Sequence, residues 1–300
     1  MNCGGIMELR VLRYYLTVAR EENITKAAEL LHITQPTLSR QLALLEEETG
    51  VQLFTRGSRR ITLTEEGLLL KHRAEEILAL ADQTMEDLQV REDHIFGTVS
   101  IGTGGLAANL VILRMAQEFR QKYPEVQFSV YTGTADLVQE RMDRGLIDFG
   151  VLLEPVNVEK YNFIRLKQKE RWCVLLKADD PLAQKEAVTR EDLRKRSLVL
   201  PERSGARSEV LNWFDCDIRK LHADYTSNLS TTAAQAVMCT DAAALILDGA
   251  LDYLDQSILV KRPLSPALES GTVIAWKKDL VQNAAKEKFL EVLSALSGNY

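Results

Sequence analysis

The sequence is poor in the residues that build metal and redox sites. It has four cysteines and four histidines in 300 residues, all far apart, and no C-x-x-C pair. Cysteines with this spacing are expected to stay reduced in the cytosol, and neither a metal nor another cofactor is expected. A redox-sensing pair formed by Cys216 and Cys239 is the alternative use of these thiols.

Long hydrophobic runs are also missing. The apolar stretch 242–247 is far too short to span a bilayer, and the N-terminus lacks the basic and apolar pattern of a signal peptide. We therefore expect a cytoplasmic protein with no membrane partner. With 46% hydrophobic and 27% charged residues, the chain is long enough for two or three globular domains.

An overall excess of positive charge is absent as well, since the net charge is −6. An acidic chain can still carry a local basic site for nucleic acid, so the distribution of charge matters more than its sum. The segment LFTRGSRR, residues 53–60, provides Arg56, Arg59 and Arg60 without any acid. This basic segment is a candidate contact with DNA.

What the N-terminal region does contain is helical periodicity. After residues 1–6, expected to be a disordered lead before an alternative start at Met7, apolar residues at helical spacing predict a helix over 8–21. A second helix is predicted from an N-cap at Thr25, and a third begins at the N-cap Thr34.

The third helix is predicted to end at Gly50 and to be followed by two short strands, 51–54 and 61–63. These strands bracket a Gly-Ser turn and form a small hairpin. Helix, turn, helix and an arginine-bearing hairpin together predict a winged helix-turn-helix, whose second motif helix enters the DNA major groove.

The third helix carries small hydrogen-bonding residues opposite Leu38, Leu42 and Leu45, which are expected to be buried. Glutamine can pair with adenine, arginine with guanine, and serine and threonine with bases or phosphates, while the helix start offers free N–H groups to a phosphate. The residues expected to contact DNA here are Thr34, Gln35, Pro36, Thr37, Ser39 and Arg40. Taken singly, Thr34, Pro36 and Ser39 are equally explained by helix capping.

A long helix is predicted from Thr64 to about Asp93. Its apolar residues alternate by four and three, as in a coiled-coil seam, which predicts dimerisation through this helix. The expected seam residues are Leu70, Ala74, Ile77, Ala81 and Leu88. The alternative is a helix that packs on its own domain.

From Gly97 onward, strands and helices alternate. Buried strands are predicted at 98–104, 126–133 and 146–153, and helices follow the first two of them. Alternation of this kind predicts a parallel sheet with right-handed crossovers. A second α/β unit is predicted to follow.

The N-terminal segment resembles the DNA-binding domain of LysR-type transcriptional regulators. The matching residues are Ala27-Ala28, Gln35-Pro36, Leu38-Ser39-Arg40-Gln41, Leu45-Glu46, Gly50, Leu53-Phe54, Arg56, Leu63-Thr64 and Gly67. Later segments match the same family: YPEV, GLIDFGV, DPLA and VTREDL. The likeness extends from Met7 over the rest of the chain.

The resemblance implies a fold and a domain organisation. A winged helix-turn-helix over 7–64 and a linker helix over 65–94 would precede a two-lobed α/β effector domain like a periplasmic binding protein. Lobe I would comprise 97–168 and 269–300, and lobe II 169–268.

The resemblance also implies partners: promoter DNA, a second copy of the chain in dimers and tetramers, a small-molecule inducer, and RNA polymerase. Arg56 and Arg59 would act on the wing. The inducer would lie between the lobes, where open α/β sheets bind ligands at strand ends. The residues expected to hold it are Thr103, Gly104, Gly105, Thr132, Thr134, Pro201, Arg203 and Ser204, with Asn228 and Ser230 as further candidates. The amides of Gly104 and Gly105 would suit an anionic ligand.

The chain departs from the family at two places. A hydroxyl residue that relatives often have shortly after Thr103 is replaced here by Gly104-Gly105-Leu106, and that hydroxyl is therefore not expected to bind a carboxylate in this chain. Relatives usually have glycines where this chain has VMCTDAAALIL from Val237, so a local turn that differs from the family's is expected there.

An enzyme is the rival interpretation. Residues 102–107 fit the dinucleotide pattern G-x-G-x-x-A after a strand, but the next strand ends without an acid placed to hold a ribose. No catalytic triad or paired-carboxylate pattern is visible. A free solute-binding protein would explain only the later two-thirds of the chain. We therefore expect a ligand-responsive regulator without catalytic activity, with a small-molecule-binding or nucleotide-dependent enzyme fused to a DNA-binding domain as the alternative.

Overall fold

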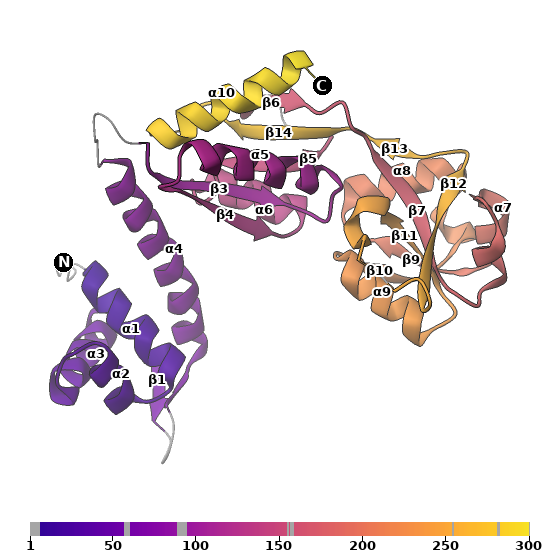
Figure 1. Cartoon of the computed structure of the whole chain (residues 1–300). Coiled ribbons are helices and arrows are strands. Elements are labelled where there is room, and N and C mark those ends of the chain that lie inside the picture. Colours follow the sequence, from indigo (N-terminus) through magenta and orange to yellow (C-terminus); the bar gives the residue numbers. More distant parts are fainter. Residues whose placement is uncertain are drawn as a thin grey trace. The chain divides into compact units, whose positions relative to one another are not determined.

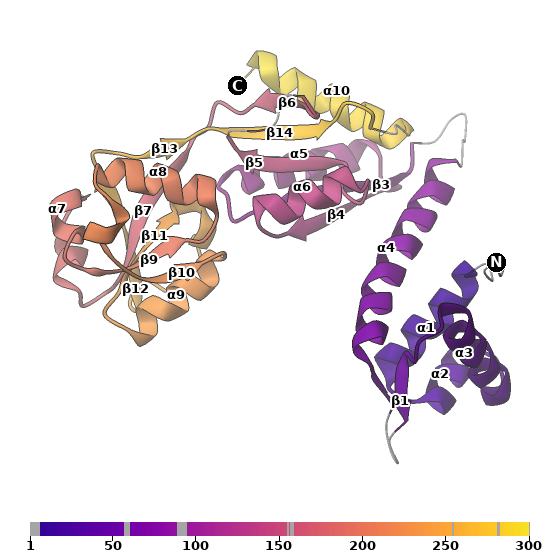
Figure 2. The same cartoon turned by 180° about the vertical axis from the view of Figure 1, so that it is seen from behind.

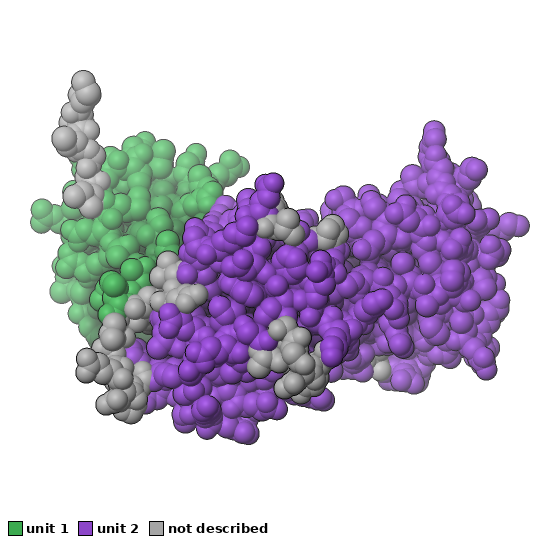
Figure 3. Space-filling model, turned by 90° about the horizontal axis from the view of Figure 1, so that it is seen from above, with its two compact units in different colours: residues 1–90 green, residues 91–300 purple. Residues whose placement is uncertain are grey.

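The computed structural model describes residues 7–56, 61–88, 95–154, 156, 159–253, 255–280 and 283–299. The chain forms two compact units, residues 1–90 and 91–300 (Figure 3). The predicted lead 1–6 and the predicted end of the long helix at Asp93 lie outside the described residues.

The first unit begins with three helices: α1 (Leu9–Glu21), α2 (Ile24–Leu30) and α3 (Gln35–Thr49). The predicted cap of α2 at Thr25 is wrong. Asn23 caps this helix, because its side chain accepts a hydrogen bond from the backbone N–H of Lys26. The helices share one core, which contains Leu12, Tyr15, Val18, Ala27, Ala28, Leu38, Leu42 and Leu45.

A two-stranded hairpin follows, with β1 (Phe54–Arg56) antiparallel to β2 (Ile61–Leu63). The long helix α4 (Glu65–Asp87) then starts beside it. Gly67 permits this close approach, since a Cβ there would lie 2.2 Å from the carbonyl oxygen of Leu53. The Tyr15 hydroxyl donates to the carbonyl of Gly67 at 2.5 Å and ties α1 to the same turn.

Helix α4 packs on the core of its own unit along one side. Ala74 is fully buried in that core, so the expectation that it faces a partner helix is wrong, whereas Leu70 is half-buried against the same core. Ile77 and Leu88 are exposed, and Ala81 is half-buried. The exposed apolar face comprises Leu69, Ile77, Leu80 and Leu88. It lies about a quarter turn around the helix from the buried stripe, because each residue advances the helix by about 100°.

The second unit contains two lobes, each built on one sheet (Figures 1 and 2). In lobe I the strand order is β4-β3-β5-β14-β6. The strands are β3 (Gly97–Thr103), β4 (Val126–Thr132), β5 (Phe149–Leu153), β6 (Tyr161–Arg165) and β14 (Thr272–Lys277). Helices α5 (Ala108–Lys122) and α10 (Ala284–Asn299) cover one face, and α6 (Ala135–Asp143) covers the other.

The lobe I sheet is mixed, which corrects the prediction of a parallel sheet. Strands β3, β4 and β5 are parallel, whereas β14 is antiparallel to β5 and β6. The reason is topological. β14 follows the return of the chain from lobe II and not a crossover helix, so it enters the sheet from the opposite end.

In lobe II the strand order is β10-β9-β11-β7-β12-β8, with β13 also paired to β7. The strands are β7 (Glu170–Lys177), β8 (Val188–Thr189), β9 (Ser197–Pro201), β10 (His222–Ser227), β11 (Ala243–Leu247), β12 (Leu259–Ser265) and β13 (Glu269–Ser270). Helices α7 (Arg190–Leu193) and α8 (Ser204–Phe214) pack on one face, and α9 (Ser230–Cys239) on the other. Short helices η1 (Pro181–Gln184), η2 (Ile218–Lys220) and η3 (Asp248–Leu251) complete the lobe.

The chain passes between the lobes twice, and the two crossings lie side by side. The first crossing leads from β6 into β7, and the second leads from β13 into β14. The crossings are joined because Glu170 pairs with Ser270, and Arg171 with Glu269, in an antiparallel ladder. The connection is therefore a two-stranded ribbon.

Candidate DNA-binding and ligand-binding sites

The start of α3 is exposed and well capped. The hydroxyl of Thr34 accepts from the backbone N–H of Thr37 at 3.4 Å, and the two hydroxyls lie 2.8 Å apart. Thr34 is therefore a cap, as its position predicts. Five of the six predicted contact residues of α3 are exposed, and Ser39 is half-buried.

The side chains of Gln35 and Arg40 at this surface are available to bind a ligand. Among the described residues, neither Gln35 nor Arg40 has a side-chain hydrogen bond or ion pair. In α1 and α2, by contrast, the cations Arg10, Arg13, Arg20 and Lys26 each pair with an acid. An unpaired arginine at the start of a capped, exposed helix is suited to bind a phosphate or a guanine edge.

The wing is held by a residue that the sequence analysis did not single out as functional. The carboxylate of Glu46 accepts from the backbone N–H groups of Leu53 at 2.7 Å and Phe54 at 3.2 Å. Glu46 thus fixes the start of β1 relative to α3. Arg56 ends β1 opposite Ile61, and Arg59 lies outside the described residues.

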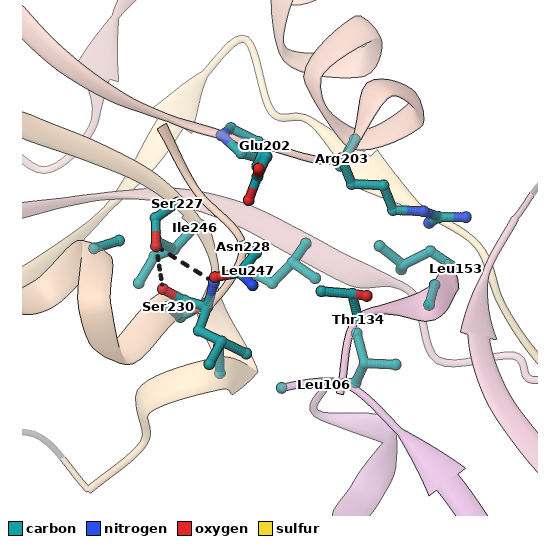
Figure 4. A pocket seen from close by; sticks show the side chains of 18 of the residues that line it. Leu106, Thr134, Leu153, Glu202, Arg203, Ser227, Asn228, Ser230, Ile246 and Leu247 are labelled. Carbon is teal, nitrogen blue, oxygen red and sulfur yellow. Dashed lines mark hydrogen bonds between the residues drawn. The ribbon is translucent and has the colours of Figure 1, made fainter. Parts of the chain in front are cut away.

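A cavity of about 310 Å³ opens between the two lobes of the second unit. Strand ends and helix starts from both lobes line it (Figure 4). Of the eight residues predicted for the ligand, six line this cavity: Gly104, Gly105, Thr132, Thr134, Pro201 and Arg203. The further candidates Asn228 and Ser230 line it as well.

Two predicted ligand residues do not line the cavity. Thr103 is buried, and its hydroxyl is bonded to the side chain of Asn109 and, at 3.2 Å, to the carbonyl of Gly104. Ser204 is exposed at the start of α8, where its carbonyl accepts from the Ser208 hydroxyl. Both residues lie at the strand ends that were used to predict the site, but the side chain of Thr103 is engaged in local hydrogen bonds and Ser204 is not part of the cavity lining.

The walls of the cavity are largely apolar. The residues that form them include Leu106, Leu153, Trp172, Leu200, Leu247 and Tyr253. Only two charged residues line the cavity in the described chain, Glu202 and Arg203. Figure 4 shows the Glu202 carboxylate directed into the space between the lobes, and Arg203 on the side of Leu153.

Arg203 joins the lobes across the cavity. Its guanidinium lies 3.3 Å from the carboxylate of Asp136, in the first turn of α6 in lobe I. Asp136 is 70% exposed and Arg203 is 21% exposed, so solvent weakens this ion pair.

Trp172 is fixed in place behind the cavity. Its indole N–H donates to the hydroxyl of Ser270 at 2.9 Å, and that hydroxyl donates to Glu209 of α8. Trp172 and Ser270 belong to the two crossing strands. The position of this cavity-lining ring is therefore set at the connection between the lobes.

The start of α5 is occupied by a side chain of the protein. The two carboxylate oxygens of Glu170 accept from the backbone N–H groups of Ala107 and Ala108, both at 2.9 Å. Glu170 is completely buried, and this burial raises the pKa of its carboxyl group. In a dinucleotide-binding protein the phosphate would take this place. The glycine of the pattern at Gly102 instead serves packing, because a Cβ there would lie 2.6 Å from Val138.

Three further features depend on which residues the described part of the chain contains: a metal site, a disulfide and a membrane-spanning helix. Within those residues, no group of three or more histidines, cysteines or acids could hold a metal ion. Cys173, Cys216 and Cys239 are free thiols there. Among the same residues, no helix is long and apolar enough to cross a membrane.

Two family models match the chain. The model described as "Bacterial regulatory helix-turn-helix protein, lysR family" matches residues 9–68, and the model "LysR substrate binding domain" matches residues 92–297. A curated relative, "Uncharacterized HTH-type transcriptional regulator YvbU" of Bacillus subtilis, is 27% identical over 297 residues, which are 97% of this chain and 99% of the relative. "HTH-type transcriptional regulator BenM" of Acinetobacter baylyi is 37% identical over 180 residues, 59% of this chain and 58% of the relative.

Solved structures show the same fold. The crystal structure of CbnR, a LysR family transcriptional regulator, is similar with a TM-score of 0.72 at 21% identity, over 97% of this chain and 99% of that chain. The structure of full-length CbnR with its target DNA has a TM-score of 0.73 at 19% identity, over 97% and 100% of the two chains. Since the second family model alone covers more than half of the residues, the chain belongs to the LysR family and is a ligand-responsive, DNA-binding transcription regulator.

Proposed function

We propose that two copies of the chain bind promoter DNA through α3 and the wing, and that a small molecule in the cavity between the lobes controls the effect on transcription. One observation supports the proposed DNA binding. The side chains of Gln35 and Arg40 in the first two turns of α3 are exposed and have no partner among the described residues. Because the protein acts by binding DNA, we propose that it is located in the cytoplasm.

The side chains of α3 divide into two roles in this proposal. Gln35, Thr37 and Arg40 contact base edges with their side chains, whereas the backbone N–H of Gln35 and the wing arginines contact phosphates. Pro36 and Ser39 are small enough for the helix to lie close in the groove. Contacts of CbnR with its target DNA, as the name of that structure states, support the same use of this domain.

Self-association is proposed through α4. Its exposed face presents Leu69, Ile77, Leu80 and Leu88, of which Leu69 and Leu88 are more than 60% exposed. Burial of such a stripe against a second copy is favourable by about 25 cal/mol per Å² of apolar surface. A twofold dimer predicts a partly palindromic DNA site with half-sites ~34–36 Å apart or a multiple of that distance.

We further propose that the protein is no enzyme. The cavity lining contains no histidine, cysteine or lysine among the described residues, so its serine and threonine hydroxyls have no imidazole or amine base beside them and no thiol is present. The buried carboxylate of Glu170 fills the helix start that a nucleotide phosphate would need. A largely apolar cavity with few charged groups fits a sensor of a small molecule.

A DNA titration tests the proposal. The full-length protein is titrated against promoter DNA from upstream of its own gene, and against a scrambled duplex, by fluorescence anisotropy at several salt concentrations. Arg40→Ala is expected to lose ~1–3 kcal/mol of sequence preference, while Arg59→Ala weakens binding to both duplexes and lowers the salt slope by about one. Arg10→Ala, at an arginine paired with Glu8, is the control. If Arg40→Ala keeps the full preference, α3 does not read the sequence.

The cavity is tested separately. A metabolite screen by thermal shift identifies stabilising ligands, and the screen is repeated with Thr134→Trp and Asn228→Trp, which fill the cavity from opposite lobes. Ligand stabilisation is expected to disappear in both variants. Stabilisation that persists in both variants would place the ligand elsewhere.

A further inference from the structure

The chemistry of the cavity limits the class of ligand that it can hold, and this step rests on the proposed function of the cavity. The walls are apolar over both lobes, with Leu106 and Leu153 on one side and Leu247 on the other (Figure 4). A volume of about 310 Å³ is at the lower end of the range of ligand pockets and suits a compact molecule. The apolar body of the ligand is therefore small.

Among the described residues, Arg203 is the one cation that lines the cavity. Its only partner among the described residues is Asp136, at 3.3 Å. Because Asp136 is 70% exposed, this ion pair stabilises the folded protein only weakly. A solvent-exposed ion pair contributes ~0–1 kcal/mol to stability. An acid that enters the apolar cavity would bind the same guanidinium away from water, where charge-assisted hydrogen bonds are stronger.

A single acidic group is favoured over two. Glu202 is the only acid that lines the cavity in the described chain, and its carboxylate is directed into the cavity. A second negative charge on the ligand would have no cation to bind and would be repelled by Glu202.

We propose that the ligand is a small monoanion with an apolar body, and that its acidic group replaces Asp136 as the partner of Arg203. Because Asp136 belongs to lobe I and Arg203 to lobe II, this exchange removes an ion pair between the lobes and substitutes a contact through the ligand. Binding of the anion thereby changes the forces that hold the lobes together. Asp136 acts as an internal competitor that sets the affinity.

Matched probes test this assignment on the full-length protein. Cyclohexanecarboxylate and cyclohexanecarboxamide have the same apolar body and differ in charge, and cyclohexanedicarboxylate adds a second charge. Binding is measured by isothermal titration calorimetry at constant ionic strength. The monocarboxylate is expected to bind with a Kd on the order of 1 mM, and about tenfold more tightly than the other two probes.

Variants identify the groups that are responsible. Arg203→Gln should remove the preference for the monocarboxylate, whereas Asp136→Asn should tighten its binding about threefold and leave the carboxamide unchanged. Glu140→Gln removes an exposed acid from the same helix without contact to Arg203, and it should change neither affinity. Circular dichroism confirms that each variant is folded, and Arg203→Lys, which retains a cation, should retain part of the preference.

The outcomes separate this inference from the proposed function. If the carboxamide binds as tightly as the carboxylate and Asn228→Trp abolishes both, the cavity is the binding site but the assignment of a monoanion is overturned. Equal binding of the dicarboxylate, or unchanged affinity in Asp136→Asn, overturns it as well. If neither probe binds, or Asn228→Trp has no effect on binding, both the ligand class and the proposed role of the cavity fail.

Discussion

The ammonium group of Lys286 lies 3.1 Å from a carboxylate oxygen of Asp148, and both side chains are almost completely buried. The other carboxylate oxygen accepts from the backbone N–H of Ser100 at 2.8 Å and from its hydroxyl at 2.7 Å. These contacts connect α10 to two strands of the lobe I sheet. A buried charge without its partner is costly, so this pair is a sensitive point of the fold.

Lys286→Met is expected to lower the free energy of unfolding by about 3–5 kcal/mol, because it removes the ammonium group that pairs with the buried carboxylate of Asp148. Urea denaturation followed by circular dichroism measures the change. Glu140→Gln, which breaks the exposed pair with Arg144, is the control and should cost about 0.5 kcal/mol or less. Equal effects of the two substitutions would show that the buried pair contributes no more than a surface pair.

Removal of the Glu46 carboxylate is expected to loosen the wing. Glu46→Ala leaves the N–H groups of Leu53 and Phe54 without their acceptor, which costs about 1–3 kcal/mol of stability. The affinity for promoter DNA should fall because the wing is no longer positioned. Anisotropy titrations measure the affinity, with the exposed Glu47→Ala as the control. Equal DNA affinities of the two variants would show that Glu46 does not contribute to DNA binding.

Substitutions on the two sides of α4 should have different effects. Leu80→Glu places a charge on the exposed face and is expected to shift dimers to monomers while the domain stays folded. Ala74→Glu buries an unpaired charge in the core of the unit and is expected to unfold it. Light scattering after size exclusion gives the mass, and thermal melting gives the stability. A dimeric Leu80→Glu variant would mean that this face is not the interface.

The helix-turn-helix was predictable because short-range patterns determine it. Leu38, Leu42 and Leu45 recur at helical spacing and are buried as predicted, and the cap at Thr34 and the end at Gly50 are local signals. The face of α4 was misjudged because its apolar residues serve two surfaces at once. Periodicity alone cannot tell a stripe that packs on α1 from one that stays exposed.

Contacts between distant segments were not predictable in the same way. Glu170 is 63 residues from Ala107, and Asp148 is far along the chain from Lys286, so no spacing in the sequence relates these partners. Six of the eight residues predicted for the ligand line the cavity because strand ends form it, whereas no pattern in the sequence relates Asp136 to Arg203. Only the fold brings α6 opposite the start of α8.

The buried Glu170 predicts a dependence of stability on pH. Burial, with Asp248 and Asp252 nearby, raises the pKa of its carboxyl group above the ordinary value of 4.5, against the opposing effect of two backbone hydrogen bonds. Lys261 lies 2.9 Å from each of these two aspartates and partly offsets them. Between 4.5 and the raised value, the folded state therefore binds more protons than the unfolded state, and stability falls as the pH rises.

Glu170→Gln removes this titration while it retains an oxygen that can accept from the backbone at the start of α5. The free energy of unfolding of the wild type minus that of the variant is therefore expected to decrease as the pH rises from about 4.5 to about 7.5. Urea denaturation across that range measures the difference, and the exposed Glu186→Gln serves as the control with no such trend. A difference that increases with pH would mean that the N–H groups of Ala107 and Ala108 outweigh burial and hold the pKa of Glu170 below its ordinary value. In that case the carboxyl group of Glu170 would be charged throughout this pH range and would hold the start of α5 as an anion.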